Sequence, residues 1–321
     1  MAFKGTYSAG GIYDSTTEMR QSLLDIIRDI SPNEDTYFIS NLSKGPNATQ
    51  RLHEWNIYHE ARATSAAGSA EGAETSYPDL QAETRSNNTT IILEAPVKLS
   101  RTKASIAEIT GEDAMGKEKE RALRRLKSKM EYAIINGAAA VGSSASAAQL
   151  CGILGSVTTN VSNYPSGLQS FTETLLNDQI QQSWNSVGAS YVGNILAVPV
   201  VLKRRIAAFG TNLTRTITAE SKRLTQEVRV YDSDVGPTVM VIAHKDIPTV
   251  ASTGATTPGN TALLVNDSLL ELAFLVKTGE PHWEDRARIG DRENGTYITE
   301  FTLVNFDEQA AVKAGGFLTT L

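Results

Sequence analysis

The sequence predicts an α+β fold in which an extended hairpin, a long helix and a compact α/β region follow one another along the chain. Three observations support this prediction. A helical pattern runs for about 25 residues, from Glu112 to Asn136. Two strand-like runs separated by a polar segment precede it, and helices alternate with strands after it. With 321 residues, the chain is long enough for one large or two medium domains with a buried core.

Composition excludes several classes of protein. The chain has 30 Lys and Arg against 36 Asp and Glu, a formal net charge of -6, and no basic run dense enough to neutralise a row of phosphates. Sequence-specific nucleic-acid binding is therefore not expected. Its one cysteine, Cys151, rules out an intramolecular disulfide and a thiolate-rich metal site. The longest near-apolar run, Ile195 to Leu202, is far shorter than the roughly 20 residues that cross a bilayer, so no membrane association is expected.

The first 45 residues predict an arm and a short helix. Residues 1–13 are rich in Gly and Ser, a composition that orders poorly unless something outside the segment holds it. Apolar side chains then recur at helical spacing until Ser31 and Pro32, where proline ends the helix. These apolar residues are Leu23, Leu24, Ile27 and Ile30.

A long hairpin is expected next. The runs from Arg51 to His59 and from Thr89 to Leu99 are rich in the β-branched and aromatic residues that suit strands. The segment between them, Ala61 to Asn88, is too polar to form a core of its own and too long for a tight turn. We therefore expect two long strands joined by a tip that only a partner molecule can hold.

The long helix is predicted to bury a narrow stripe and to expose a charged face, and it ends at Gly137. At about 1.5 Å per residue it would form a rod of nearly 40 Å. The stripe consists of Met115, Leu123, Leu126, Met130, Ala133 and Ile134. The charged face consists of Glu118, Lys119, Glu120, Arg121, Arg124, Arg125, Lys127 and Lys129, with Glu120 and Arg124 at the favourable i,i+4 spacing.

The rest of the chain predicts an α/β lobe and two final strands. A capping box is expected at Ser170 and Glu173. The final strands, Ser268–Val276 and Tyr297–Val304, flank a polar connection that contains Gly279, Gly290 and Gly295. The elements expected in the lobe are helix 173–187, strand 194–198, helix 201–209, strand 227–231 and strand 238–244.

No cofactor, metal or catalytic group is expected. His53 and His59 lie roughly 20 Å apart on a strand, and His244 and His282 stand alone, so ordinary surface or core histidines are favoured over ligands or bases. Asp232 and Asp234 are interpreted as part of a turn, because the residues after them supply no further oxygen ligands. Cys151 lacks a neighbouring base in the sequence and is expected to be a small buried residue.

In this order, the predicted elements resemble the capsid fold of tailed phages, herpesviruses and encapsulins. Short motifs resemble those of phage major head proteins and cover nearly the whole chain. Tyr37 differs from the family's usual proline, and Asn305 and Glu308 are separated where an Asn-Glu pair is more usual. The motif residues are Ile30-Ser31-Pro32, Asp35-Thr36-Tyr37-Phe38, Gly45, His53-Glu54-Trp55, Glu71-Gly72-Ala73, Arg85 to Asn88, Ser100-Arg101-Thr102, Glu131, Cys151-Gly152-Ile153, Asn305, Glu308 and Ala310.

The resemblance implies a division of the chain and a set of partners. The expected parts are an N-arm and short helix (1–45), an E-loop hairpin (46–100), a P-domain spine helix (101–140), a central A-domain (141–267), and returning P-domain strands with the C-terminus (268–321). The implied partners are other copies in hexamers and pentamers, a scaffolding protein, a portal, a decoration protein and non-specifically contacted packaged DNA. The implied location is the virion capsid, assembled in the host bacterial cytoplasm. Residues expected at the subunit interface are Glu71, Gly72, Ala73, Glu74, Arg121, Arg124 and Arg125.

Three other functions are weighed against a phage capsid. An encapsulin shell would share the fold and would load an enzyme through a cargo peptide. A phage tail or baseplate component would share the Ser-, Thr- and Gly-rich composition but should have more strands and no spine helix. A hydrolase using Asp232 and Asp234 would need a pocket, a base and a nucleophile that the sequence does not identify.

Overall fold

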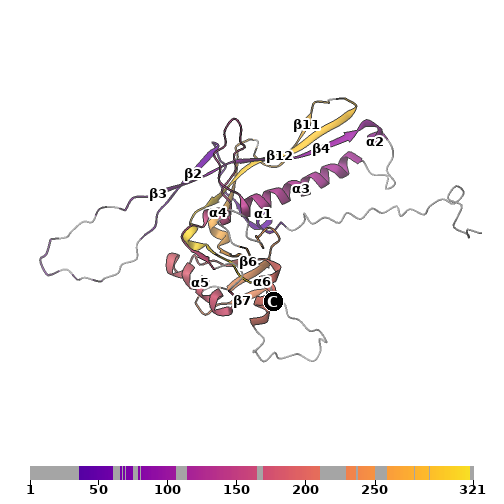
Figure 1. Cartoon of the computed structure of the whole chain (residues 1–321). Coiled ribbons are helices and arrows are strands. Elements are labelled where there is room, and N and C mark those ends of the chain that lie inside the picture. Colours follow the sequence, from indigo (N-terminus) through magenta and orange to yellow (C-terminus); the bar gives the residue numbers. More distant parts are fainter. Residues whose placement is uncertain are drawn as a thin grey trace, which may run out of the picture.

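The computed structural model describes residues 36–60, 66, 68, 70–74, 79, 81–105, 114–164, 169–209, 229–235, 238–249, 259–277, 279–288 and 290–318. These residues form three β-sheets with helices around them, and two extended projections leave a central body in different directions (Figure 1). Within these ranges no helix is both long enough and apolar enough to cross a membrane. The expected N-arm over 1–13 and the short helix that ends at Pro32 lie outside the described residues.

The central strand of the five-stranded sheet is β12 (Arg292–Asn305). One of its edges pairs antiparallel with β4 (Ile91–Ser100), and the other pairs with β11 (His282–Arg286) and then with β10 (Leu270–Phe274). The short strand β1 (Ser43–Lys44) pairs in parallel with β10. Because β12 extends past β10, it carries β4 and β11 away from the body as a three-stranded blade (Figure 1). Helix α2 (Arg101–Ser105) follows β4 at the end of the blade.

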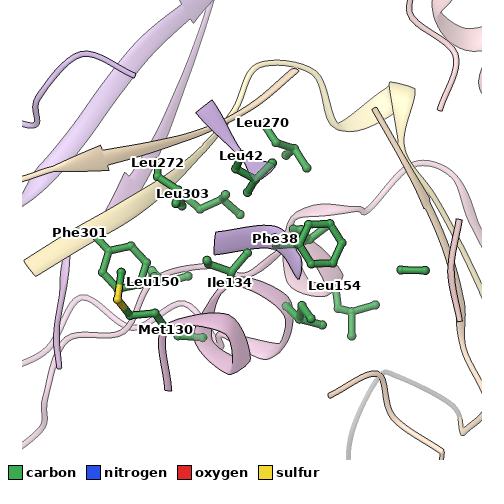
Figure 2. Packing of buried hydrophobic residues seen from close by; sticks show 14 of the residues in the cluster. Phe38, Leu42, Met130, Ile134, Leu150, Leu154, Leu270, Leu272, Phe301 and Leu303 are labelled. Carbon is green, nitrogen blue, oxygen red and sulfur yellow. The ribbon is translucent and has the colours of Figure 1, made fainter. Parts of the chain in front are cut away.

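Helix α3 (Ala114–Asn136) packs against β4 and β12. Its side chains Leu126, Met130 and Ile134 are completely buried and belong to one core with Phe301 and Leu303 of β12 (Figure 2). Each fully buried aliphatic side chain contributes about 1.5–3 kcal/mol. The short helices α1 (Tyr37–Asn41) and α4 (Ile153–Ser156) also contribute buried side chains to this core.

A six-stranded sheet separates this core from a second one. The strand β6 (Ile195–Val198) is buried at all four positions. Its side chains alternate, because Ile195 and Ala197 belong to the core around α3, whereas Leu196 and Val198 belong to the core under α5 (Glu173–Val187) and α6 (Val200–Phe209). The sheet order is β5 (Val161–Asn163), β13 (Val312–Gly315), β9 (Ala262–Val265), β6, β8 (Thr238–Ala243) and β7 (Val230–Asp232).

The third sheet is a ribbon of two antiparallel strands, β2 (Leu52–Ile57) and β3 (Thr84–Thr89). It leaves the body on the side away from the blade (Figure 1). Its position corrects the prediction that 89–99 is the second strand of the hairpin, because those residues form β4 and pair with β12. The true partner strand, β3, has the sequence TRSNNT. Because β3 belongs to an exposed ribbon, its side chains need not alternate between apolar and polar. The pattern that identifies a strand in a sequence is therefore absent from these residues.

The polar connection predicted between the two final strands is also wrong, because half of it forms β11 and the start of β12. Gly295 lies in β12, where an added Cβ atom would lie 2.0 Å from Cζ2 of Trp283. Glycine therefore leaves room for the indole ring, which packs edge-on against Tyr297 at 5.0 Å between ring centroids. Lys119 of α3 places its Nζ 4.6 Å from the centre of an indole ring of Trp283. The strand β11 is polar because each of its five residues is half-buried or exposed.

Other differences concern single residues and the last strand. Helix α5 has the predicted bounds, but Thr172 is its N-cap, whereas the hydroxyl of Ser170 accepts a hydrogen bond from Arg205 (2.5 Å). On α3, Leu123 is half-buried and the buried stripe passes through Ala122. The strand β13 pairs with β9 and β5 in the six-stranded sheet. This strand therefore lies in a different sheet from β12, although the sequence prediction grouped all of 268–321 together.

Candidate functional site

The β2–β3 ribbon is exposed along both strands. Pairing extends from Leu52 opposite Thr89 to Ile57 opposite Thr84, and exposed positions alternate with half-buried ones along β2. Leu52 is 44% exposed, and Tyr58, just beyond the strand, is 56% exposed. An isolated two-stranded ribbon is marginally stable at best in water. Contacts at its base and on its surface must therefore hold it.

Asn88 holds the base of the ribbon. Its Nδ2 donates to the carbonyl oxygens of Cys151 (3.0 Å) and Leu303 (2.8 Å). Its Oδ1 accepts from the backbone N–H groups of Cys151 (2.8 Å) and Thr89 (2.8 Å). These four bonds satisfy every donor and acceptor of the buried amide. Asn88 thus joins the end of β3 to β12 and to the segment before α4.

Two further contacts connect the ribbon to the body. The indole N–H of Trp55 donates to the carbonyl oxygen of Asn305 (3.2 Å), and the Asn305 side chain donates to the hydroxyl of Ser156 (3.1 Å). The Nδ1 of His59 lies 3.6 Å from Oδ2 of Asp307. All five residues line a cavity of about 500 Å³ between the ribbon and the body. The ribbon is therefore attached at separate points around a hollow.

Two adjacent carboxyl groups beside this cavity have opposite pKa shifts. Burial alone would raise the pKa of Glu308, but the N–H groups of Thr158 (2.7 Å) and Thr159 (3.1 Å) and the Thr159 hydroxyl donate to its carboxylate, so its pKa is lowered. Burial raises the pKa of Asp307, although a backbone hydrogen bond and His59 act in the opposite direction. Glu308 is thus a stabilised anion that links 158–159 to the residues after β12.

Residues that carry the family resemblance meet at this point. Trp55, Asn88, Cys151, Asn305 and Glu308 lie far apart in the sequence, and all five line the cavity beneath the ribbon. The sequence alone gave each as part of a short motif and could not indicate that they share one location. Trp55, Asn88, Cys151 and Asn305 connect the ribbon to the body, and Glu308 fixes the neighbouring backbone of Thr158 and Thr159.

The predicted interface residues of the hairpin tip lie in a tight turn. The N–H of Ala73 donates to the carbonyl oxygen of Ala70 (3.0 Å), and Gly72 has a φ of 80°, a value that glycine adopts without strain. Glu71 and Glu74 are both exposed. The turn therefore presents two carboxylates to solvent beyond the end of the ribbon.

The predicted arginines lie on α3. Arg121 pairs with Glu118 (2.8 Å) and Arg124 pairs with Glu120 (2.5 Å), both along the helix. Arg125 is exposed and has no ion pair with any residue that the structure describes. Because the ribbon and the N-terminal half of α3 leave the body in different directions (Figure 1), the structure does not bring the glutamates and the arginines of one subunit together.

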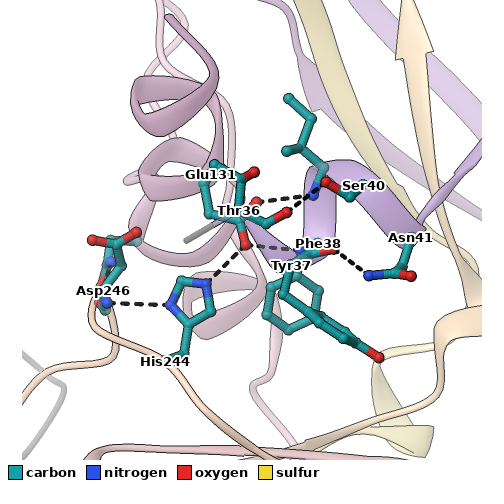
Figure 3. A network of polar contacts seen from close by, with 10 residues as sticks. Thr36, Tyr37, Phe38, Ser40, Asn41, Glu131, His244 and Asp246 are labelled. Atoms are coloured by element: carbon teal, nitrogen blue, oxygen red, sulfur yellow. Dashed lines mark hydrogen bonds and ion pairs between the residues drawn. The ribbon is translucent and has the colours of Figure 1, made fainter. Parts of the chain in front are cut away.

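A buried polar cluster on the opposite side of α3 was missed. The Glu131 carboxylate accepts from the N–H groups of Phe38 (2.8 Å) and Ile39 (2.8 Å) at the start of α1, and it lies 2.8 Å from Nε2 of His244 (Figure 3). Thr36, the N-cap residue, makes no side-chain cap bond, so Glu131 fills that role from another helix. His244 is a core histidine, one of the two ordinary roles that the sequence favoured, but it does not stand alone because Glu131 is its partner. In the sequence, the signal for this cluster was the position of Glu131 next to the apolar stripe of α3.

Other polar groups have structural surroundings. Within the described ranges, no three His, Cys, Asp or Glu side chains come together as a metal site. Cys151 is half-buried, and burial raises the pKa of its thiol, which disfavours the nucleophilic thiolate. Asp232 accepts from the hydroxyl of Thr238 (3.0 Å), and Ser233 accepts from the N–H of Val235 (3.2 Å), in the turn that the sequence predicts between β7 and β8.

The comparison with protein families gives the function of this arrangement. Residues 5–317 match the family described as SU10 major capsid protein. The chain belongs to this capsid family. Its function is therefore structural, and copies of it form a capsid shell in the virion. No curated protein sequence matches the chain.

Solved structures show that this capsid protein has the predicted fold. The cyanophage A-1(L) capsid has a TM-score of 0.67 and 13% identity, over 95% of this chain and 98% of that chain. A structure from Gordonia phage Cozz has a TM-score of 0.59 and 14% identity, over 97% and 96%. The SrpI encapsulin complex of Synechococcus elongatus has a TM-score of 0.55 and 14% identity, over 94% of each chain. The predicted phage capsid fold is confirmed.

Proposed function

We propose that this capsid protein assembles as hexamers and pentamers into an icosahedral or prolate head that encloses the double-stranded DNA of a phage. The observation that carries the proposal is the β2–β3 ribbon, which projects from the body with exposed side chains along both strands and is attached through contacts of Trp55, Asn88 and His59. A neighbouring subunit would supply the contacts that the ribbon lacks. The net charge of -6 fits a wall that contacts the packaged DNA only weakly and without sequence specificity. A strongly basic wall would bind the DNA tightly.

The proposal assigns each region of the chain to a part of the capsid fold. The β2–β3 ribbon corresponds to the E-loop, α3 and the blade to the P-domain, and the six-stranded sheet with α5 and α6 to the A-domain. Residues 1–13 would form an N-arm that reaches a neighbour. A scaffolding protein, a portal and a decoration protein complete the proposed partners, and assembly would take place in the host cytoplasm without any catalytic step by this chain.

The proposed subunit contact joins the hairpin turn of one subunit to α3 of the next. Glu71 and Glu74 are exposed on the turn, and the φ of Gly72 lets its backbone approach another surface closely. Among the three predicted arginines, Arg125 is favoured, because Arg121 and Arg124 are already paired along the helix. A charge-assisted pair with Arg125 would then fix the ribbon on its neighbour.

Deletion of Ala66 to Pro78 tests the role of the ribbon. The segment contains almost no large apolar side chain, so the melting temperature of the unassembled protein should be unchanged, whereas the yield of particles should fall sharply. Melting temperature and particle yield should be measured on the same preparation. Normal particle yield, or an unfolded monomer, would contradict the proposal.

Charge reversal tests the specific contact. Arg125→Glu and the pair Glu71→Lys with Glu74→Lys should each lower particle yield, and their combination should restore it. Arg124→Glu is the matched control, because its partner is Glu120 of the same helix, and it should not rescue the lysine variants. Rescue by Arg124→Glu, or no rescue by Arg125→Glu, would show that Arg125 is not the contact.

A further inference from the structure

A groove with apolar walls lies between α3 and β4. It has a volume of about 620 Å³, and its apolar lining residues are Ile91 and Leu93 of β4, Tyr132 and Ala133 of α3, and Ala138. Tyr132 is 57% exposed, and Ile91 and Leu93 are only partly covered. An exposed aromatic ring beside aliphatic side chains is typical of a surface that another segment covers.

The groove continues along the last turns of α3. A second cavity of about 1030 Å³ shares Tyr132, Asn136, Ala138 and Asp246 with the first, so the two form one channel on the surface. Lys129 lines the first cavity and Lys245 the second. The channel therefore combines apolar and polar side chains, and its lining has three lysines, Lys129, Lys245 and Lys313, against one carboxylate, Asp246. This lining suits an amphipathic segment with acidic side chains.

The described chain begins beside this channel. The first residues of α1 bind Glu131, which precedes Tyr132 in α3, and the N–H of Asp246 donates to Nδ1 of His244 (3.2 Å), whose ring contacts Glu131 (Figure 3). Thr36, the first described residue, thus lies close to the helix turn that carries Tyr132. The six peptide links from Ile30 to Thr36 span at most about 20 Å, which limits how far from Thr36 the preceding apolar residues can lie.

The sequence before Thr36 has the chemistry that the channel requires. Leu23, Leu24, Ile27 and Ile30 recur on one face at helical spacing. Residues 14–35 contain six acidic side chains against two basic ones. This segment therefore combines an apolar stripe with the charge opposite to that of Lys129 and Lys245.

We propose that residues 21–30 form an amphipathic helix that docks in the channel of their own subunit, with its apolar stripe against Tyr132, Ile91 and Leu93. The docked helix would cover the aromatic ring and extend the core around α3. Residues 1–13 would remain available to contact a neighbouring subunit. Docking within one subunit needs no shell, so this proposal can fail or succeed independently of the assembly contacts proposed above.

Photo-crosslinking tests the docking. The full chain with p-benzoylphenylalanine in place of Tyr132 is irradiated as the unassembled protein and digested with trypsin. The crosslinked partner should be the tryptic peptide Gln21–Arg28, which contains Leu23, Leu24 and Ile27. The same replacement at Tyr191, an exposed tyrosine that lines neither cavity, is the control and should not capture this peptide.

Two further measurements make the result decisive. Ile27→Asp should abolish the Tyr132 crosslink without changing the melting temperature by more than a few degrees, whereas Asp25→Asn should preserve it. A mixture of isotopically heavy and light chains distinguishes crosslinks within a subunit from those between subunits. Mixed heavy–light crosslinks in the proportion expected for random pairing of subunits, capture of a different peptide, or capture that survives Ile27→Asp would each overturn the proposal.

Discussion

Nε2 of His244 lies 2.8 Å from Oε1 of Glu131, and neither side chain is exposed to solvent. The N–H of Asp246 donates to Nδ1 of the same imidazole, so the hydrogen-bonding partners assign the proton to Nε2, which donates to Glu131. Glu131 thus accepts three hydrogen bonds, from this ring and from the amides of Phe38 and Ile39. One carboxylate holds together α1, α3 and the end of β8.

Removal of this carboxylate should strongly destabilise the subunit. Glu131→Ala leaves two buried amides and an imidazole N–H unpaired, and we expect the free energy of unfolding to fall by about 3–5 kcal/mol. Glu120→Ala, which removes a mostly exposed partner of Arg124, should cost below about 1 kcal/mol. Urea unfolding of the unassembled variants measures both. Equal effects would show that Glu131 has no special role.

Asn88 and Asn87 form a matched pair of neighbours in β3. Asn88 is buried with four hydrogen bonds, whereas Asn87 is exposed. Asn88→Ala should lower the free energy of unfolding by about 2–3 kcal/mol, because it leaves buried backbone groups without partners. Asn87→Ala should change it by less than about 0.5 kcal/mol. Hydrogen exchange of the amides of Cys151 and Thr89 should also accelerate in Asn88→Ala, and unchanged exchange there would contradict the assignment.

Glu308 should make the subunit sensitive to acid. Its pKa in the folded protein is lower than in the unfolded chain, so its contribution to stability is present above the ordinary glutamate pKa and is lost as the pH falls through the folded value. Glu308→Gln should therefore flatten the loss of stability below about pH 4.5. Unfolding free energies of the unassembled protein from pH 6 downward measure this slope.

Asp307 provides the opposite control. Its pKa is raised in the folded protein, so its contribution to stability decreases as the pH rises through that value. Asp307→Asn removes this contribution and should make the loss of stability on acidification steeper. A flatter curve for Asp307→Asn, or a steeper one for Glu308→Gln, would show that the shifts are assigned with the wrong sign.

Gly295 tests the packing of the blade. Gly295→Ala places a methyl group in the space of the Trp283 ring, and we expect a loss of about 1–3 kcal/mol. The additional change Trp283→Ala removes the clash, so Gly295→Ala should cost nearly nothing in that background. A double-mutant cycle by thermal unfolding measures the difference. Additive effects would show that the two residues do not compete for space.

Elements with a buried face could be predicted from the sequence. Helix α5 has the predicted bounds, and α6 begins one residue before the expected start, because their apolar residues recur at helical spacing. The strands β3 and β11 were missed for the opposite reason. They carry sequences such as TRSNNT and HWEDR, whose polar side chains suit strands that are exposed on an extended ribbon and blade.

The candidate site could be predicted only in part. The turn at Glu71 to Glu74 and the charged face of α3 follow from local sequence. The convergence of Asn88, Cys151 and Glu308 on one cavity does not, because it depends on pairings between residues separated by more than 60 positions. A single sequence contains no signal for contacts between residues that lie so far apart along the chain. The Glu131–His244 contact, over 113 positions, was missed for the same reason.

The pairing of β4 with β12 fixes the timing of folding during protein synthesis. Residues 91–100 leave the ribosome roughly 200 residues before their partners at 292–301. Asn88 is separated from its partner Leu303 by a similar length of chain. Until then the edge of β4 is unpaired, and the ribbon lacks its contacts with Leu303, Asn305 and Asp307. A nascent chain without β12 therefore cannot present the ribbon in its final orientation. Incorporation into a shell is restricted to polypeptides that have been translated past this strand, which keeps unfinished chains out of the lattice.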